Sequence, residues 1–249
     1  MTLDLKEFFT LNNKAAVAFS GGVDSSYLLY AANEAGTDVR AYYVRSQFQP
    51  AFELEDALRI AEYTGTEMKV IEVDVLSDQT VISNPEDRCY HCKRVIMGTI
   101  IREASADGYG LVLDGTNASD DTDDRPGTRA LKEFGVRSPL RECGLTKPEI
   151  RKLAKEAGLS VWNKPAYACL ATRIPHGEVI TADKLRTTER AESLLYEMGF
   201  RDFRVRMRGE SALVQVTSEQ HEKALAKYSD IAAALSKMYR EVIIDDNTR

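Results

Sequence analysis

The run Ser-Gly-Gly-Val-Asp-Ser near the amino end is the feature that most restricts what this chain can fold into. A short β-favouring stretch precedes the run, and an apolar stretch with helical character follows it. The two glycines have no Cβ, so the backbone can turn sharply and bring its N–H groups close to an anion. Hydroxyl and carboxylate groups lie where a pyrophosphate and its metal ion would bind. The predicted binding residues are Ser20, Gly21, Gly22, Asp24 and Ser25.

The rest of the first two thirds of the chain alternates between strand-like and helix-like patterns. This alternation predicts the α/β class, with a parallel sheet that carries helices on both faces. Ligands of such sheets bind beyond the carboxyl ends of the strands. Ser46, Gly115 and Asp114–Asn117 follow predicted strands, so we expect them to lie around the same crevice as the glycine-rich run. The predicted strands are 17–19, 39–44, 68–73 and 111–113, and the predicted helices are 27–35, 52–63 and 95–106.

The pattern changes after Pro175. A helix, a strand pair around Arg208-Gly209-Glu210, a second helix and a final strand are predicted for a smaller α+β domain. We therefore expect a domain of residues 1–175 and a second one of residues 176–249. The second is too small to bury its apolar faces alone, so it should pack on the first domain or on copies of itself. Its predicted elements are 181–198, 203–207, 212–216, 220–238 and 241–244.

Charge and composition exclude several classes of protein. A net charge of −6 argues against a general nucleic-acid binder, which usually carries a basic surplus. No apolar stretch approaches the roughly 18 residues that a membrane span needs, and no secretory signal is evident at the start. With 43% hydrophobic residues the chain can bury a core, and we expect a cytoplasmic protein without a membrane partner.

Four cysteines in a cytoplasmic protein are more typical of thiols, metal ligands or catalysts than of disulfides. Cys89 and Cys92 form a CxxC, Cys169 follows much later, and Cys143 stands apart as a small apolar residue. The CxxC is in the wrong place for a thioredoxin-like redox pair, and a zinc site would need a histidine to complete it. Three cysteines also suit a [4Fe–4S] cluster with one iron left open. The histidines available for zinc are His91 and His176.

The glycine-rich run resembles the PP-loop of the ATP pyrophosphatase superfamily, which has the adenine nucleotide alpha hydrolase-like fold. Further motifs, spread over most of the chain, are similar to those of the LarE family. This family contains the ATP-dependent sulfur transferases of nickel-pincer cofactor synthesis. The motifs are Asp114–Asn117, Asp124–Gly127, Val161–Pro165, Cys169–Gly177 and Phe203–Arg206.

The resemblance implies a reaction and its cofactors. ATP and Mg²⁺ would adenylate a carboxylate of pyridinium-3,5-biscarboxylic acid mononucleotide, which sulfur then converts to a thiocarboxylate. One branch of the family sacrifices the sulfur of a single cysteine. Another branch holds a [4Fe–4S] cluster with three cysteines and uses it to deliver sulfide from an outside source. Cys89, Cys92 and Cys169 place this chain with the second branch, and the family forms homo-oligomers, including hexamers.

Individual roles follow from the motifs, each with an alternative. Asp24 is expected near Mg²⁺, and Cys169 and Arg173 in catalysis, with Arg173 on a substrate carboxylate or in a structural ion pair. Arg204 and Arg206, two residues apart on a strand, share a face and are predicted to bind the mononucleotide phosphate, unless that face is simply solvated. The acidic stretch Asp120, Asp121, Asp123 and Asp124 is interpreted as a solvated loop in preference to a metal site.

Other functions remain open at this point. A tRNA-thiolating PP-loop enzyme with the same cluster would act on nucleic acid, and an amide-forming synthetase would use ammonia but leave the cysteines unexplained. A module that binds AMP without chemistry would release no pyrophosphate. Without a cluster, Cys169 itself would be the sacrificial sulfur donor.

Overall fold

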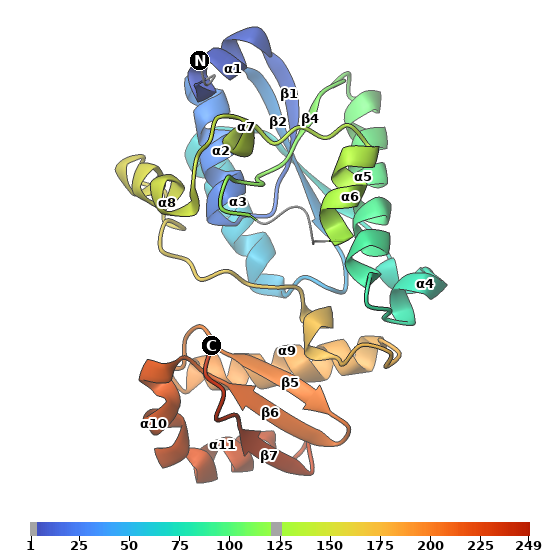
Figure 1. Ribbon diagram of the computed structural model, residues 1–249, viewed down its shortest axis with the longest axis vertical. Helices are drawn as coiled ribbons and strands as arrows, with labels where there is room; N and C mark the ends of the chain where they lie inside the picture. The colour runs from blue at the N-terminus through green and yellow to red at the C-terminus, as the bar shows by residue number, and fades with distance from the viewer. Residues whose placement is uncertain (1–3, 121–125) are drawn as a thin grey trace. The chain divides into compact units, whose positions relative to one another are not determined.

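The computed structural model describes residues 4–120 and 126–249 and divides the chain into two compact units (Figure 1). Unit 1 comprises residues 1–46, 51–75 and 87–164, and unit 2 comprises residues 47–50, 76–86 and 165–249. The expected division into domains 1–175 and 176–249 stays a prediction. Asp121, Asp123, Asp124 and Arg125, which the sequence analysis discussed, lie outside the described residues.

Unit 1 contains a four-stranded parallel sheet with the strand order β3-β2-β1-β4. The predicted α/β class with a parallel sheet is therefore confirmed. The strands are β1 (Lys14–Ala18), β2 (Asp38–Arg45), β3 (Met68–Glu72) and β4 (Val112–Leu113). The helices are α1 (Leu5–Leu11), α2 (Val23–Glu34), α3 (Ala51–Thr64), α5 (Arg88–Ala106), α6 (Pro126–Glu133), α7 (Pro139–Glu142) and α8 (Lys147–Glu156).

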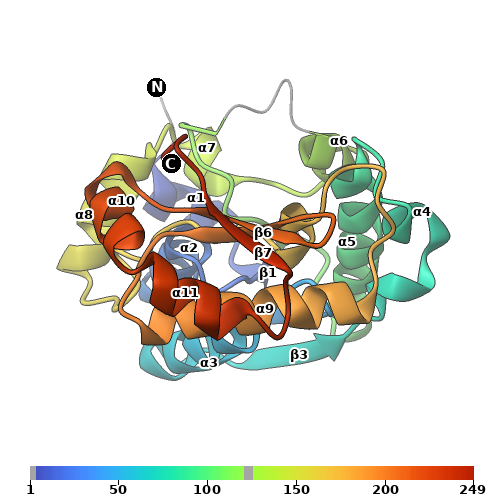
Figure 2. The ribbon, with the colours of Figure 1, turned by 90° about the horizontal axis from the view of Figure 1, so that it is seen from below.

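Both faces of this sheet are buried under helices (Figures 1 and 2). Successive residues of a strand point to opposite faces. Val17 accordingly packs with apolar residues of α1, α2, α3 and α8, whereas the adjacent Ala16 packs with residues of α5 and α6. The same alternation separates Tyr43 from Tyr42 on β2. Two apolar cores, one on each face, thus hold the sheet in place.

The chain order of the strands reverses at β1. Strands β2 and β3 follow β1 toward one edge of the sheet, while β4 pairs with the other side of β1. Helix connections leave the two sides of such a point in opposite directions, which opens a crevice at the carboxyl ends of the two strands. The glycine-rich loop after β1 and the Asp114–Asn117 loop after β4 meet there.

Three helices differ from their sequence-based bounds by more than one residue, and the first of them, α2, begins at Val23 and not at residue 27. Helix α5 begins at Arg88, seven residues before the expected start at residue 95, and so includes Cys89 and Cys92. The helix expected over 220–238 is two helices, α10 (Ser218–Ala226) and α11 (Tyr228–Leu235). Ser and Asp favour the first turn of a helix over its interior. Ser229 and Asp230 follow Lys227 closely, which explains why a new helix, α11, begins at Tyr228.

Unit 2 is built on a three-stranded mixed sheet. Strands β5 (Arg204–Arg208) and β6 (Ser211–Gln215) form the predicted antiparallel pair, and β7 (Glu241–Ile244) runs parallel to β6. Apolar residues of the three strands pack with those of α9 (Ala182–Glu197), α10 and α11, and Figure 2 shows α9 beside α11. The remaining elements are η1 (Val75–Ser77), α4 (Gln79–Ile82) and the short 3₁₀ helix η2 (Leu170–Arg173).

Short segments from early in the chain complete unit 2. The Leu170 N–H donates to the Phe48 carbonyl at 2.9 Å. Asn84 is fully buried with a φ of 54°, a conformation that asparagine tolerates better than most residues. The Asn84 side-chain amide donates to the Pro175 carbonyl at 2.7 Å, and the Asn84 carbonyl accepts from Gly177 at 2.8 Å. Across the described parts of the chain, no helix combines the length and apolarity that crossing a membrane requires.

We predict that the Tyr42 phenol makes stability fall at alkaline pH. Burial, with Asp107 accepting its hydrogen bond at 3.0 Å, raises the pKa of Tyr42 from 10.0 to about 12. Because the folded protein holds this proton more tightly, the contribution to stability is complete below the unfolded pKa and is lost as pH rises from 10.0 toward about 12. Urea unfolding across this range should show a smaller loss for Tyr42→Phe than for the wild type. The exposed control Tyr196→Phe should keep the wild-type slope, and a Tyr42→Phe slope equal to it would contradict the prediction.

Candidate functional site

The loop after β1 has the geometry of an anion-binding turn. Gly21 has a φ of 71°, which a residue with a side chain rarely adopts, and its missing Cβ would lie 3.1 Å from the backbone of Ala57. The Ser25 hydroxyl donates to the Gly22 carbonyl at 3.2 Å and accepts from the Ser20 N–H at 3.3 Å. These bonds close the loop on itself and leave the first N–H groups of α2 at its rim, where an anion is favoured.

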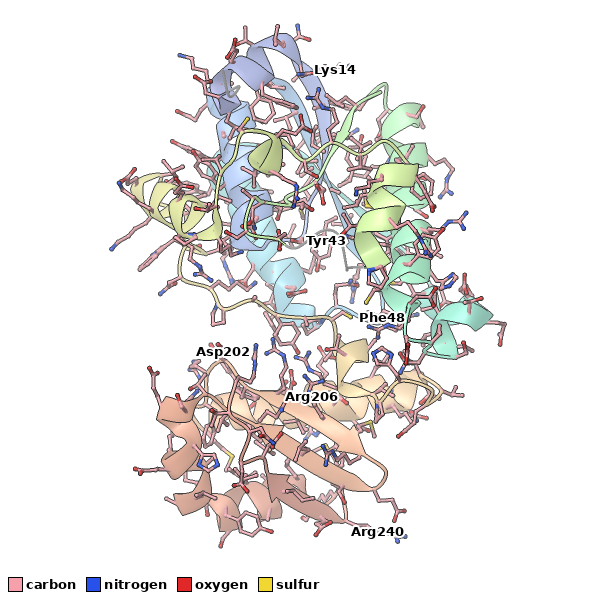
Figure 3. The ribbon with its side chains drawn as sticks, viewed as in Figure 1. Lys14, Tyr43, Phe48, Asp202, Arg206 and Arg240 are labelled. Atoms are coloured by element: carbon pink, nitrogen blue, oxygen red, sulfur yellow. The ribbon has the colours of Figure 1, made fainter. Side chains whose placement is uncertain are left out.

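The loop after β4 passes against this turn at very close range. A Cβ on Gly115 would lie 2.8 Å from the Ser25 backbone nitrogen, closer than such atoms approach one another. Gly115 is therefore required by packing as well as by its place at the strand end. Ser46, the other predicted residue of this edge, is buried directly after β2, three residues beyond Tyr43 (Figure 3). Unit 1 thus brings together, at the carboxyl edge of its sheet, the seven residues predicted to bind nucleotide there, namely Ser20, Gly21, Gly22, Asp24, Ser25, Ser46 and Gly115.

Asp24, in the first turn of α2, is held from both sides. Its Oδ1 accepts from the Asn117 side-chain amide at 3.3 Å, and its Oδ2 forms an ion pair with the Lys147 ammonium. Lys147 is the first residue of α8 and was not among the predicted site residues. Lys147 is 123 residues from Asp24 in the sequence, and no local pattern indicates this pairing.

A hydrogen-bond network supports the loop after β4. Asp114 is buried and accepts from Thr116 at 2.5 Å and from Ser138 at 2.6 Å. The Asn117 N–H donates to Asp120 Oδ2 at 3.0 Å. Asp120, the one residue of the acidic stretch that the structure describes, therefore supports the loop that holds Asp24.

The CxxC occupies the start of α5. Cys89 is exposed and Cys92 half-buried, and their spacing of three residues places them on one helix face. Between them, the Tyr90 hydroxyl donates to the Glu133 carboxylate at 2.9 Å, and the Arg129 guanidinium stacks on its ring at 3.6 Å. Tyr90 thus fixes the cysteine-bearing turn to α6.

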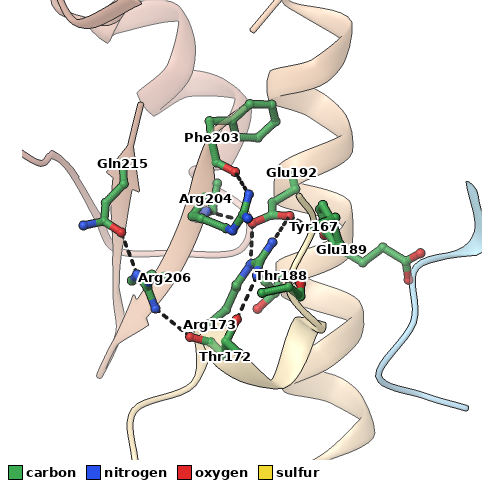
Figure 4. A network of polar contacts seen from close by, with 12 residues as sticks. Tyr167, Thr172, Arg173, Thr188, Glu189, Glu192, Phe203, Arg204, Arg206 and Gln215 are labelled. Carbon is green, nitrogen blue, oxygen red and sulfur yellow. Dashed lines mark hydrogen bonds and ion pairs between the residues drawn. The ribbon is translucent and has the colours of Figure 1, made fainter. Parts of the chain in front are cut away.

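Cys169 and Arg173 lie in unit 2. A buried carboxylate, Glu192, pairs with Arg173 (Figure 4). Arg173 is fully buried, and its Nε and Nη2 donate to Glu192 at 2.8 and 3.0 Å. Its Nη1 donates to the Ala168 carbonyl at 2.9 Å, and the Cys169 carbonyl accepts from Thr172. These contacts match the structural alternative for Arg173, an ion pair, and its predicted catalytic role stays a prediction.

Glu192 is the residue of this cluster that sequence reasoning missed. Besides Arg173, it accepts from the Tyr167 hydroxyl and from the Val205 N–H at 2.9 Å. Burial beside this carboxylate raises the pKa of Tyr167. No local pattern distinguishes Glu192 from the other acidic residues of α9, because its partners come from distant segments.

Arg204 and Arg206 lie two residues apart on β5 and so share a face, as predicted from their spacing (Figure 4). Arg204 is buried and donates to the Ala166 carbonyl at 2.8 Å, and Arg206 donates to the Thr172 carbonyl at 2.7 Å. Burial, together with the nearby Arg173, lowers the pKa of Arg204 to about 10. The two guanidiniums therefore flank the segment that carries Cys169.

No pre-formed metal site is found in residues 4–120 and 126–249, where no three His, Cys, Asp and Glu side chains lie close enough to hold a metal ion. Cys89 and Cys92 belong to unit 1 and Cys169 to unit 2. His91 pairs with Asp87 at 3.2 Å. Cys143 packs against the core of unit 1, where burial raises its pKa, as expected for a cysteine that serves packing.

Comparisons with known proteins connect this geometry to a family. Residues 14–92 match the family described as queuosine biosynthesis protein QueC. The chain is 35% identical to the pyridinium-3,5-bisthiocarboxylic acid mononucleotide synthase of Lactiplantibacillus plantarum, over 82% of this chain and 74% of that protein. It is 38% identical to an uncharacterised protein of Synechocystis sp., over 87% of this chain and 81% of that protein.

More distant relatives share only part of their length with this chain. The tRNA-specific 2-thiouridylase MnmA of Thermotoga petrophila is 26% identical over 61% of this chain and 54% of that protein.

We predict that Gly115→Ala destabilises the protein because its Cβ would collide with the Ser25 backbone nitrogen. Overpacking of this kind costs about 1–3 kcal/mol of unfolding free energy. Urea denaturation of Gly115→Ala and Gly110→Ala measures the difference, since a Cβ on Gly110 meets no atom within 4 Å. Equal stability of the two variants would refute the close approach.

We predict that Glu192→Gln destabilises the protein by about 3–5 kcal/mol, because it leaves the buried Arg173 without its counter-charge. Denaturant unfolding, with hydrogen exchange at the Val205 N–H, measures both the stability and the local loss. Glu197→Gln, an exposed change on the same helix, is the matched control. A Glu192→Gln variant as stable as this control would show that the ion pair contributes nothing.

Proposed function

Because the chain belongs to the LarE family, which includes a pyridinium-3,5-bisthiocarboxylic acid mononucleotide synthase, we propose that it is an ATP-dependent sulfur transferase acting on the mononucleotide precursor. The observation that carries the proposal is the turn of residues 20–25 meeting Gly115 where the strand order reverses. That arrangement combines helix N–H groups, hydroxyls and a carboxylate, which are the groups that bind a nucleoside triphosphate and its metal ion.

The proposed reaction has two steps. A carboxylate oxygen of pyridinium-3,5-biscarboxylic acid mononucleotide attacks the α-phosphorus of ATP, the bond to the bridging oxygen breaks, and pyrophosphate leaves. Hydrosulfide then attacks the acyl carbon of the acyl-adenylate, the bond to AMP breaks, and a thiocarboxylate forms with release of one proton. Adenylation is needed because a free carboxylate resists nucleophiles. No oxidation or reduction occurs.

The residues of the loop have distinct proposed roles. Gly21, Gly22 and Ser25 bind the pyrophosphate portion of ATP and stabilise the charge that accumulates as it leaves. Asp24 is the proposed Mg²⁺ ligand, because it supplies the carboxylate of the turn and Mg²⁺ prefers oxygen ligands such as carboxylates. Bound Mg²⁺ would supply charge neutralisation along the phosphates. Ser46 is proposed to line the nucleotide site.

The cysteines fit the donor set of an iron–sulfur cluster. Such clusters are normally held by cysteine thiolates, and Cys89 and Cys92 share one helix face. We therefore propose Cys89, Cys92 and Cys169 as ligands of a [4Fe–4S] cluster. When bound, it would supply an open iron at which sulfide from an outside donor is held. The Tyr90 contacts keep the first two thiols on a fixed turn, and the Arg173 contacts keep the Cys169 backbone in place.

Unit 2 is proposed to bind the rest of the substrate. Arg204 and Arg206 would contact the mononucleotide phosphate with the N–H groups that remain after their carbonyl contacts. Arg173 could bind a substrate carboxylate only if this carboxylate displaced Glu192 from part of the Arg173 guanidinium. The segment 176–249 is also the proposed surface for homo-oligomers such as hexamers, and the cytoplasm, where thiols stay reduced, is the proposed compartment.

A tRNA-thiolating activity is the alternative that the thiouridylase relatives favour. It predicts tRNA binding that weakens steeply with salt, which filter binding at two salt concentrations measures. Sacrificial donation from Cys169 is the second alternative. It predicts a mass loss corresponding to one sulfur after a single turnover, without iron.

We predict that protein purified without oxygen contains about four irons per chain and that Cys89→Ala removes them. Iron and sulfide analysis with the visible absorption spectrum measures the cluster, and calorimetry with ATP measures the nucleotide site. Cys89→Ala should keep ATP binding, because the cysteine lies outside the loop, and Cys143→Ala should keep both.

The activity itself is tested with the mononucleotide, ATP, Mg²⁺ and sulfide. Mass spectrometry should detect the thiocarboxylate product together with AMP and pyrophosphate. Full iron in Cys89→Ala would refute the ligand assignment. Pyrophosphate release without a thiocarboxylate would refute the sulfur-transfer proposal.

A further inference from the structure

The ion pair between Lys147 and Asp24 neutralises the carboxylate of the turn of residues 20–25. Asp24 lies in the first turn of α2, and Lys147 reaches it from the first residue of α8. The side chains are 29% and 22% exposed, so the pair is partly shielded from water. Asn117 occupies the other carboxylate oxygen at 3.3 Å. In the protein without nucleotide, an ammonium therefore already occupies the carboxylate oxygen that a metal ion would use.

Lys147 is held firmly enough for this contact to be specific. Its N–H donates to the Ser119 hydroxyl at 2.9 Å, which ties α8 to the loop after β4. The Thr146 N–H donates to Glu149 at 2.8 Å and caps the helix at the same point. The body of α8 packs against α2 through Ile150 in the core of unit 1. The start of α8 is thus fixed against both elements that carry the nucleotide-binding loops.

The other lysines of this helix have different partners. Lys155 lies over the Trp162 ring at 4.6 Å, and Lys152 is 78% exposed beside Glu156. Among the described lysines of α8, only Lys147 therefore contacts the loop of residues 20–25.

A divalent cation and an ammonium compete for the same Asp24 oxygen. When a triphosphate enters with its metal ion, Asp24 can bind the metal only if Lys147 leaves it. The phosphate chain brings several negative oxygens within the same site, and an ammonium on a flexible stem can turn to them without moving its helix. We propose that Lys147 is a nucleotide-binding residue that exchanges Asp24 for the phosphates of ATP, and that it keeps divalent metal ions off Asp24 until nucleotide arrives.

This proposal rests on the proposed function in one respect, namely that the loop binds ATP. It predicts changes in nucleotide and metal affinity that a purely structural ion pair would not cause. Removal of the ammonium should weaken nucleotide binding and, in the absence of nucleotide, strengthen metal binding. The two affinities should therefore change in opposite directions.

The test uses Lys147→Met, which keeps the apolar stem and removes the charge, with Lys147→Arg and Lys152→Met as matched variants. Calorimetry with ATP and Mg²⁺ should show binding weaker by about tenfold to a hundredfold for Lys147→Met, the value of a hydrogen bond to a charged group. Electron paramagnetic resonance of Mn²⁺ added to nucleotide-free protein should show binding tighter by roughly threefold or more. Lys147→Arg should recover part of the ATP affinity, and Lys152→Met should match the wild type in both measurements.

Each remaining outcome is decisive. Weaker binding of both ATP and Mn²⁺ by Lys147→Met would show that Lys147 has only a structural role. Unchanged ATP affinity would show that Lys147 does not bind the nucleotide. If the wild type binds ATP and Lys147→Met shows the two opposite changes, but the wild type forms no thiocarboxylate, the sulfur-transfer function is refuted and this inference stands. Wild-type protein that binds no ATP would overturn both.

Discussion

The approach of two backbones at the carboxyl edge of the parallel sheet is the constraint on which the rest of the site depends. Residue 115 has no room for a side chain, because a Cβ there would lie 2.8 Å from the Ser25 nitrogen. This approach brings Asn117 to Asp24, and the Ala118 N–H then donates to the Leu145 carbonyl at 2.8 Å just before α8. The position of Lys147 is therefore a consequence of how closely the loop after β4 passes the start of α2.

The fold of unit 1 could be predicted because its signals are local. Strand-like and helix-like stretches alternate along the chain, and this alternation indicates a parallel sheet covered by helices. The turn of residues 20–25 is equally local, since glycine and hydroxyl residues specify its shape within six positions. The start of α5 was less predictable, because the polar residues around the CxxC interrupt the apolar spacing on which a helix prediction relies.

The charge partners of the site could not be predicted from sequence. Lys147 is 123 residues from Asp24, and Glu192 is 19 residues from Arg173 on a separate element. Neither pair has a spacing that indicates contact, because the contact depends on where the packed elements carry the side chains. The same reason explains why Arg173 had two interpretations. Only the tertiary structure shows that its guanidinium donates twice to a carboxylate.

The way in which unit 2 is assembled from three segments has a consequence for synthesis on the ribosome. Its segments 47–50 and 76–86 emerge early, but their hydrogen-bond partners, such as Leu170 and Gly177, are translated much later. Unit 1 has all of its residues once residue 164 has left the exit tunnel, whereas those two segments still lack the partners that follow residue 164 in the chain. The nascent chain therefore passes through a stage in which the turn of residues 20–25 is complete while the scaffold around Cys169 does not yet exist.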